Sequence, residues 1–435
     1  MVKGLLATCL TVLSSGAAVA CENGVYAGPD GQRLVISNRG YEGAPPQWRY
    51  GFIDGRFGAV SAAESPVHCT STGVEVSIDN KPAMAWTRVP LAETPAHFKS
   101  FDAQLDGLLI EPQDGQTKHP LVILLHGSES TAALQFGRNY AYIFAAQGIA
   151  VFMYDKRGTG TSEGFYTQDF ELLADDAVAA SEEARRMLAG RYSRWGYFGG
   201  SQGGWIGPRA AEKSNPDFVE VGFGLVETPL EEDQQQVQLE LRNKGYGPDV
   251  LAKALQVTNA TAVVVASHFT SGYDQLKQIK ERYGKEPWFS QIKGEFTGTV
   301  LHDDPAELRV TGEARVNPVG VLWHYDAQRV VRSLKMPQLW VLAGADREAP
   351  SDLARERLTD LIHQGHNIDL YVYPHTDHGI ADYVELPNGD RKVTRIADGY
   401  LRLLGDWAKE KLNPPYGRAE KVGGNGTAKP VQRAH

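Results

Sequence analysis

Gly199-Gly200-Ser201-Gln202-Gly203 decides the fold, because this stretch joins a run of apolar residues to a segment of helical pattern. The run at 195–198 reads Trp-Gly-Tyr-Phe, and the segment after the stretch opens with Gly-Trp-Ile. A serine on a sharp turn between a strand and a helix needs small neighbours, since the backbone there is strained and the flanking chain passes close by. A bare Gly-x-Ser-x-Gly arises by chance in many proteins, but this context indicates a nucleophilic serine, Ser201.

Further apolar runs surround this turn and alternate with amphipathic segments. The predicted strands are 121–125, 150–154, 195–198, 218–225, 337–342 and 368–373. The predicted helices are 132–147, 172–189, 351–364 and 393–411. Apolar runs without alternation are typical of strands that are buried on both faces. The pattern therefore predicts an α/β fold with a doubly wound, mostly parallel sheet.

Three other kinds of sequence accompany the predicted α/β domain, which spans 96–412. Residues 21–95 are rich in Gly, Pro and aromatics and contain short β-like runs, so they predict a small β-rich accessory domain. We expect it to cover or space the next domain, with a binding role as the alternative. Residues 228–335 insert charged helical segments between two strands, which is typical of a cap over an active site. Residues 413–435 lack periodicity and predict a disordered tail.

Residues 1–20 have the plan of a signal peptide, with a lysine, a short apolar stretch and small residues at the end. No later segment reaches the roughly 18 uninterrupted apolar residues of a membrane span, so we expect no transmembrane segment. Cleavage after Ala20 leaves Cys21 and Cys69, and an oxidising compartment favours a disulfide between them. We therefore expect a secreted or periplasmic protein, with a lipoprotein anchored at Cys21 as the alternative.

The composition is that of an acidic globular protein. The 435 residues include 53 Asp and Glu against 44 Lys and Arg, which gives a formal net charge of -9, and no basic block is interleaved with aromatics. This charge pattern argues against a nucleic-acid partner. A hydrophobic content of 42% is enough for a sizeable core. The sequence does not determine the oligomeric state.

Ser201 needs partners, because a serine hydroxyl is a weak nucleophile at neutral pH. An adjacent imidazole takes its proton, and a buried carboxylate fixes the tautomer of that imidazole. In this arrangement the acid follows a late strand and the histidine follows the last one. The first of these loops offers Asp346, with Glu348 as a less favoured substitute. The second offers His378, which precedes a glycine, with His375 as the alternative base.

Acyl transfer also needs N–H donors that face the developing oxyanion. One is the backbone N–H of the residue after the nucleophile, which is Gln202, and the loop 126–130 offers Ser128 as the candidate for the second. We interpret His126 in this loop as a packing residue at a strand end. Two His-x-x-His pairs late in the chain have no completing ligands at metal-site spacing, so we expect neither a metal nor an organic cofactor.

These motifs together resemble those of secreted bacterial α/β-hydrolases of the esterase and S9/S33-peptidase-like group. The resemblance rests on Leu-Leu-His-Gly-Ser at 124–128, Tyr-Asp-Lys-Arg-Gly at 154–158, Gly-Gly-Ser-Gln-Gly-Gly at 199–204, Ala-Gly-Ala-Asp at 343–346 and His-Thr-Asp-His-Gly at 375–379. It covers about residues 97–411 and implies the α/β-hydrolase fold, with triad roles for Ser201, Asp346 and His378. The oxyanion roles fall on Gln202 and Ser128, and residues 21–95 lie outside the resemblance.

The function that these residues predict is hydrolysis of a small-molecule carboxylic ester through an acyl-enzyme on Ser201. A serine peptidase acting on short peptides is the alternative, and acidic pairs such as Glu231-Glu232 or Asp303-Asp304 would anchor the peptide amine. A catalytically inactive binding protein is the third hypothesis, although every triad role is filled. Aromatic residues of the insertion indicate either an apolar acyl pocket or core packing: Trp288, Phe289, Trp323 and Tyr325.

Overall fold

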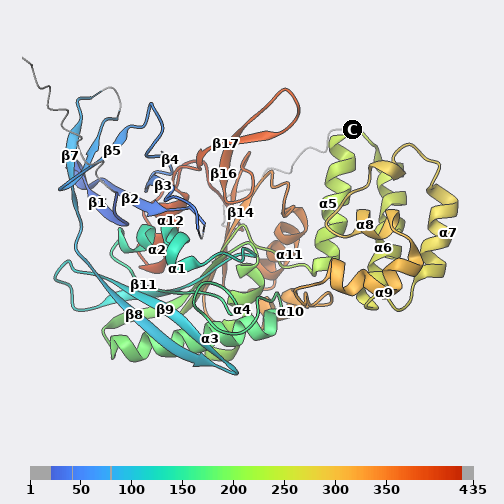
Figure 1. The fold of residues 1–435 in the computed structure, drawn as a ribbon, viewed down its shortest axis with the longest axis horizontal. Coiled ribbons are helices and arrows are strands. Elements are labelled where there is room, and N and C mark those ends of the chain that lie inside the picture. Colours follow the sequence, from blue (N-terminus) through green and yellow to red (C-terminus); the bar gives the residue numbers. More distant parts are fainter. Residues whose placement is uncertain (1–20, 42, 79–80, 424–435) are drawn as a thin grey trace, which may run out of the picture.

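The computed structural model describes residues 21–41, 43–78 and 81–423 (Figure 1). The predicted signal peptide, residues 1–20, lies outside the described residues, and so does the end of the predicted tail, residues 424–435. Within the described part, a central sheet carries helices on both faces, a small β-domain lies beside it, and a helical insertion extends on the side away from that β-domain (Figure 1).

The central sheet has nine strands and the doubly wound arrangement that the sequence predicts. In spatial order the strands are β18 (Glu420–Val422), β15 (Ile368–Tyr373), β14 (Gln338–Ala343), β13 (Phe218–Gly222), β12 (Tyr192–Gly200), β10 (His119–Leu125), β11 (Ala150–Tyr154), β9 (Ala103–Pro112) and β8 (Leu91–Ser100). The strands from β15 to β11 pair in parallel, whereas β18, β9 and β8 pair antiparallel at the two edges. The parallel strands are almost wholly buried, which explains their unbroken apolar pattern.

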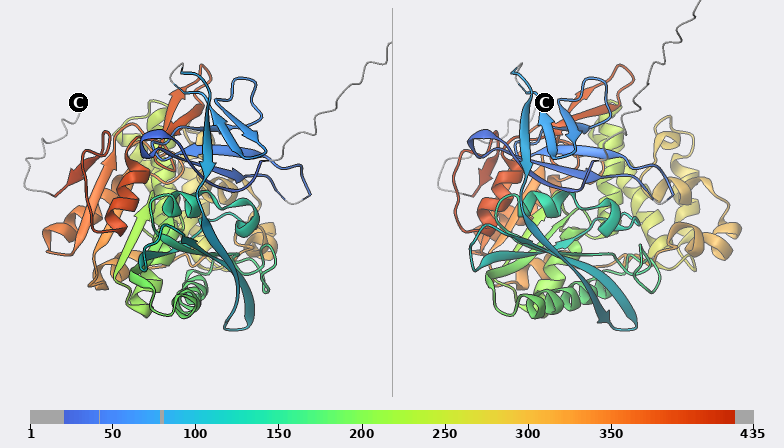
Figure 2. Two further views of the ribbon diagram at one scale, coloured as in Figure 1. Left: turned by 90° about the vertical axis from the view of Figure 1, so that its left-hand side faces the viewer. Right: turned by 60° about the vertical axis from the view of Figure 1, so that its left-hand side comes forward.

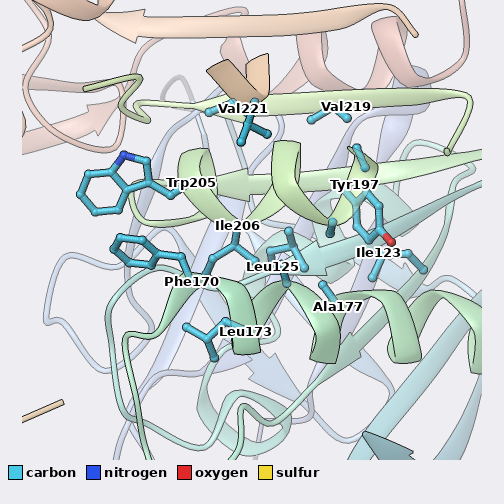
Figure 3. Packing of buried hydrophobic residues seen from close by; sticks show 14 of the residues in the cluster. Ile123, Leu125, Phe170, Leu173, Ala177, Tyr197, Trp205, Ile206, Val219 and Val221 are labelled. Atoms are coloured by element: carbon cyan, nitrogen blue, oxygen red, sulfur yellow. The ribbon is translucent and has the colours of Figure 1, made fainter. Parts of the chain in front are cut away.

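Helices cover the two faces of this sheet. One face packs against α3 (Phe170–Leu188), α4 (Gly203–Ser214), α10 (Ala327–Ser333) and α11 (Asp352–His363). The other packs against α1 (Ala133–Phe136), α2 (Asn139–Ala145) and α12 (Tyr400–Ala408). Figure 3 shows the first of these cores, in which Phe170 of α3 and Trp205 of α4 have ring centroids 4.6 Å apart. Burial of such large side chains fixes α4, and with it the turn that carries Ser201.

Two helix predictions need correction. The predicted helix 132–147 is divided into α1 and α2, since the chain leaves the helical conformation at Gly137. The predicted helix 393–411 is wrong in its first part, where β17 (Arg391–Ile396) pairs with β16 (Ala381–Glu385) in a hairpin. The Asn-Gly turn between these strands favours a hairpin, and Gly399, with a φ of 85°, separates the hairpin from α12.

The N-terminal β-domain is a seven-stranded antiparallel sheet, which confirms the predicted β-rich segment. Its strands are β1 (Gly24–Ala27), β2 (Arg33–Asn38), β3 (Trp48–Phe52), β4 (Phe57–Ala59), β5 (Val67–Thr70), β6 (Gly73–Val76) and β7 (Met84–Arg88). The predicted disulfide between Cys21 and Cys69 is present, with Cα atoms 5.3 Å apart. This sheet lies over α1 and α2, as two views agree (Figures 1 and 2), and Val25 and Val35 share the core of that face.

Both predicted ends of the α/β domain differ from the structure. The central sheet begins with β8, so the predicted start at residue 96 falls inside a strand. β8 contains Pro95, which the sheet accommodates because β8 is an edge strand. The prediction of a disordered tail from residue 413 is wrong for residues 413–423, because Tyr416 is buried and β18 pairs with β15. A three-residue strand of polar composition depends on the edge that it joins, which no local pattern reveals.

The helical insertion lies between β13 and β14 and has a core of its own. Its helices are α5 (Pro229–Asn243), α6 (Pro248–Ala266), α7 (Tyr273–Tyr283), α8 (Thr297–His302) and α9 (Pro305–Val316). The acyl-pocket interpretation of its aromatic residues is wrong. Trp288, Phe289 and Trp323 are buried in this core, and Tyr325 is buried beneath α4. By length and composition α6 is apolar enough for a membrane span, yet it packs against α5, α7 and α8.

Candidate active site

The predicted site residues follow neighbouring parallel strands, so the structure brings them to one edge of the sheet. Ser201 comes directly after β12, Asp346 follows β14 and His378 follows β15. Because β12, β13, β14 and β15 are adjacent and parallel, their carboxyl ends lie side by side. Ligands of open α/β sheets bind at this edge.

Ser201 occupies a tight turn between β12 and α4. Its φ is 53°, in the left-handed region that a side chain rarely adopts, and its N–H donates to the carbonyl of Gly222 at 3.1 Å. A Cβ on Gly199 would lie 2.8 Å from the Cα of Gly203, and one on Gly200 would lie 2.3 Å from the ring of Phe223. The glycines are therefore required by close packing on both sides of the turn. Backbone strain held in place by packing is common at functional sites.

Asp346 and His378 form a hydrogen-bonded pair beside this turn. Oδ2 of Asp346 lies 2.9 Å from Nδ1 of His378, and Asp346 is only 4% exposed. Its other oxygen accepts the N–H of Glu348 at 3.0 Å and of Ala349 at 2.8 Å. The carboxylate can therefore hold the imidazole in one tautomer, with Nε2 left to face a substrate or a serine.

The surroundings of His378 act on its pKa in opposite directions. Burial lowers the pKa, but the hydrogen bond and charge of Asp346 outweigh it, with the charges of Glu348 and Asp377 adding to the rise. The net effect is a pKa above the ordinary histidine value. Phe223 packs edge-on against the imidazole, with ring centroids 4.9 Å apart.

The alternative acid and base have weaker positions in the structure. Glu348 has a side chain that is 69% exposed, and its Oε1 lies 3.8 Å from Nε2 of His378. His375 is exposed, and it is His378 that contacts the carboxylate of Asp346. These positions favour Asp346 over Glu348 and His378 over His375.

The loop after β10 lies against the Ser201 turn and is held from outside by two side chains. A Cβ on Gly127 would lie 3.6 Å from the Cβ of Ser201. Nζ of Lys156 donates to the carbonyl of Gly127 at 2.7 Å, and the hydroxyl of Tyr166 donates to the carbonyl of Ser128. In a trans peptide the N–H points opposite to the preceding C=O, so the N–H of Ser128 points away from Lys156.

Gln202 begins α4, where backbone N–H groups and the helix dipole favour negative charge. Its side chain is 2% exposed, and neither polar atom of its amide has a hydrogen-bond partner among the described residues. Gln202 and Ser128 are thus near the serine turn on two different loops.

A search against protein-family models identifies residues 116–282 as matching serine aminopeptidase, S33. This span contains the Ser201 turn. The turn lies in a mostly parallel sheet with helices on both faces. The chain has the α/β-hydrolase fold. A search of curated proteins finds no match.

Solved structures similar to this chain include an esterase of Pyrococcus furiosus. Its identity is 15%, the match covers 66% of this chain and 84% of that chain, and the TM-score is 0.40. An acylaminoacyl peptidase of Pyrococcus horikoshii has 15% identity, coverage of 90% and 56%, and a TM-score of 0.43. A proline iminopeptidase of Mycobacterium smegmatis has 17% identity, coverage of 66% and 92%, and a TM-score of 0.39. The chain thus spans 56% of the length of the acylaminoacyl peptidase.

His126 is a packing residue in this structure, as its position at the end of β10 predicts. Burial lowers its pKa, Glu129 opposes this effect, and the charges of Lys156 and Arg39 reinforce it. Its imidazole is therefore neutral near pH 7. Burial also lowers the pKa of Lys156 to about 8, against the charge of Glu129.

A group of carboxylates near Asp346 includes Glu232, one member of the acidic pair 231–232 that the sequence offered as an amine anchor. Burial raises the pKa of Glu232 well above its usual range, and the charges of Glu295, Glu227 and Asp346 add to the rise. No hydrogen bond or ion pair joins Glu232 to any other described side chain. The only sequence signal was the acidic pair at 231–232, in which α5 gives each carboxylate a different direction.

Two of the acidic residues that the sequence offered as amine anchors, Glu231 and Asp303, have structural partners instead. Glu231 completes a capping box at the start of α5, and its Oε1 lies 2.5 Å from Nη2 of Arg357. Asp303 pairs with Arg315 at 2.6 Å. Among the described residues, no group of three or more His, Cys, Asp or Glu side chains could hold a metal ion.

Proposed function

We propose that this α/β-hydrolase cleaves carboxylic esters through an acyl-enzyme intermediate on Ser201. The observation that carries the proposal is the hydrogen bond between Asp346 and His378. Two backbone N–H groups fix the carboxylate of Asp346, and both residues lie at the sheet edge where the Ser201 turn lies. A buried, oriented carboxylate–imidazole pair next to a strained serine is the arrangement that nucleophilic catalysis requires.

The mechanism follows from these positions in two steps. Oγ of Ser201 attacks the ester carbonyl while Nε2 of His378 takes the hydroxyl proton, and the resulting imidazolium gives that proton to the leaving alcohol as the carbon–oxygen bond breaks. Water then adds to the acyl-enzyme, His378 takes its proton, and the proton returns to Oγ of Ser201 as the acid leaves. Asp346 keeps the imidazole oriented and stabilises its charge in both steps.

Oxyanion stabilisation is assigned to backbone groups. The N–H of Gln202 at the start of α4 and the N–H of Ser128 in the loop after β10 would face the carbonyl oxygen as it becomes negative. Lys156 and Tyr166 support the second donor, because they hold the carbonyls of Gly127 and Ser128 on the outer side of the loop.

An ester is favoured over an amide by what the leaving group demands. An alkoxide leaves with little help, so a triad and two oxyanion donors are enough. An amide requires timed protonation of its nitrogen and firm holding of the peptide. The single seven-stranded sheet of the N-terminal β-domain is much smaller than a propeller of several four-stranded blades, which could supply such holding.

Labelling and kinetics test the proposal together. A fluorophosphonate probe should label the wild type on Ser201 and leave Ser201→Ala unlabelled, although both fold alike because each residue carries only a small side chain at this turn. We expect kcat/KM for short-chain p-nitrophenyl esters to exceed that for aminoacyl p-nitroanilides by at least about 100-fold, roughly 2.7 kcal/mol in transition-state terms. Turnover by Ser201→Ala within about tenfold of the wild type would contradict the assignment.

A peptidase acting on a free amino terminus is the second candidate, and Glu232 favours it. Its carboxylate has no partner in the described chain and lies close enough to Asp346 for their charges to interact. If amides are the substrates, Glu232→Gln should abolish aminoacyl p-nitroanilide turnover and spare ester turnover. Glu281→Gln, which changes an exposed carboxylate on α7, is the matched control.

We also propose that the protein is exported and that cleavage leaves Cys21 as the first residue. The Cys21–Cys69 disulfide supports an oxidising compartment. It also opposes the lipoprotein alternative, since a lipid thioether would use the same sulfur of Cys21. Mass mapping of the exported protein under non-reducing conditions should find the disulfide, whereas a diacylglyceryl mass on Cys21 would contradict this assignment.

A further inference from the structure

A cavity of about 490 Å³ lies where the N-terminal β-domain meets the catalytic domain. Its walls include Tyr50 and Phe57 from the β-domain, Tyr140 and Ile143 from α2, and Leu401 from α12. Small-molecule sites typically enclose roughly 300–1,000 Å³ and are mostly apolar with a few polar groups. The size and the aromatic lining of this cavity suit an apolar or aromatic group.

The cavity adjoins the proposed catalytic base. Phe223 and Gly379 line it, Gly379 is bonded to His378, and the ring of Phe223 packs against the imidazole. Phe223 has a φ of 40°, which is unusual for a bulky residue, and its N–H donates to the carbonyl of Val341 at 2.7 Å. In the proposed mechanism His378 protonates the leaving alcohol, so that alcohol lies on the His378 side of the serine. The cavity is therefore placed to receive the leaving group.

Three arginines of the β-domain also line the cavity, and no acidic residue does. Arg56 is occupied by Asp54, with a closest approach of 2.7 Å. Arg39 and Arg49 form no ion pair or side-chain hydrogen bond with another residue in 21–41, 43–78 or 81–423. Within a chain of net charge -9, this is a local concentration of positive charge.

Arg39 also acts on two groups inside the site. Burial raises the pKa of Tyr140 to about 12, and the charge of Arg39 opposes that rise. The same charge helps to lower the pKa of His126 behind the oxyanion loop. Arg39 therefore lies near enough to both residues for its charge to act on them.

We infer that the β-domain forms part of the substrate site, and that Arg39 and Arg49 bind a carboxylate carried by the leaving alcohol of the ester. Guanidinium groups bind carboxylates with paired, charge-assisted hydrogen bonds, and the aromatic walls accept the apolar group between that carboxylate and the ester oxygen. The inference rests on the proposed ester hydrolysis at Ser201. It gives the β-domain a role in selecting substrates beyond covering the catalytic domain.

Matched aryl acetates test this inference. The set is 4-acetoxybenzoate, 4-acetoxyphenylacetate and 3-(4-acetoxyphenyl)propionate, each compared with its neutral carboxamide, so that spacer length and charge vary separately. For the best spacer, we expect the wild type to prefer the carboxylate by about tenfold or more in kcat/KM at low ionic strength, as a charge-assisted pair allows. Added salt should reduce the preference, because partly exposed charges are screened.

Variants test whether Arg39 and Arg49 cause the preference for the carboxylate substrate. Arg39→Gln/Arg49→Gln should bring the carboxylate-to-carboxamide ratio of kcat/KM close to one, because neutral amide side chains no longer distinguish the two substrates by charge. Arg33→Gln, which removes an arginine of β2 outside this cavity, should keep the ratio. A ratio near one in the wild type for all three spacers, or a preference that survives the double variant, would overturn the inference. Fluorophosphonate labelling separates the two proposals, since an unlabelled Ser201 refutes the ester mechanism itself.

Discussion

Oδ2 of Asp346 lies 2.9 Å from Nδ1 of His378, and the other oxygen of the same carboxylate accepts two backbone N–H groups. One oxygen of this carboxylate is thus fixed by its own loop, and the other oxygen orients the imidazole of His378. The residues come from loops after β14 and β15, and only the parallel pairing of these strands places them together. The first prediction depends on this contact.

Asp346→Asn should lower kcat for ester hydrolysis by about 10³- to 10⁴-fold with little change in folding. The asparagine oxygen still accepts the N–H groups of Glu348 and Ala349, but its amide favours the wrong imidazole tautomer, an effect that costs about 10⁴ in a serine triad. Steady-state kinetics measure the loss, and thermal unfolding checks the fold. Glu348→Gln should stay within about tenfold of the wild type.

Two outcomes would contradict this assignment of the triad. One is a greater loss in Glu348→Gln than in Asp346→Asn, which would make Glu348 the acid. The other is a greater loss in His375→Ala than in His378→Ala, which would make His375 the base.

The pH dependence of kcat/KM should reflect the raised pKa of His378. The imidazole must be neutral to take the serine proton, so activity should rise with pH through a midpoint above about 6.5, the ordinary histidine value. Glu348→Gln removes one of the charges that raise this pKa, and the midpoint should move to lower pH. A wild-type midpoint below about 6.5, or an upward shift in the variant, would be inconsistent with the structure.

Lys156→Met should lower kcat by about tenfold or more with little change in KM. The variant loses the donor to the carbonyl of Gly127, so the peptide that presents the N–H of Ser128 is free to rotate. Loss of one oxyanion donor costs about 10²- to 10³-fold, and loosening a donor should cost less. Lys213→Met, on the outer face of α4, is the control and should leave kcat unchanged. A change confined to KM would indicate a role in substrate binding.

A buried ion pair next to Lys156 should matter for stability. Nε of Arg157 donates to Asp176 at 2.8 Å and Nη2 at 2.7 Å, and the Asp176 side chain is 0% exposed. Asp176→Ala leaves this arginine largely unpaired, which should cost about 3–5 kcal/mol in the free energy of unfolding measured with urea. Asp102→Asn removes the exposed partner of the same arginine and should cost less than about 1 kcal/mol. Equal losses in the two variants would contradict this difference in burial.

The tight turn at Ser201, the parallel strands and the positions of Asp346 and His378 directly after late strands could all be predicted from the sequence. Each leaves a local signal: glycines on both sides of Ser201, apolar runs of strand length, and an acid and a histidine directly after late strands. One local signal was misread. The start of the predicted helix 393–411 falls on β17, although β17 has β-branched residues and follows an Asn-Gly turn.

The tertiary structure alone decided which polar side chains lie around Asp346 and His378. Glu232 approaches Asp346 only because α5 leaves β13 in one direction, whereas the neighbouring Glu231 turns to Arg357. Arg39 and Arg49 line a cavity beside His378 only because the β-domain packs over α1 and α2. These contacts are between residues that are distant in the chain, and the distances between them depend on how whole helices and strands pack. A local pattern records how one segment folds, and it contains no information about which face of another segment will meet it.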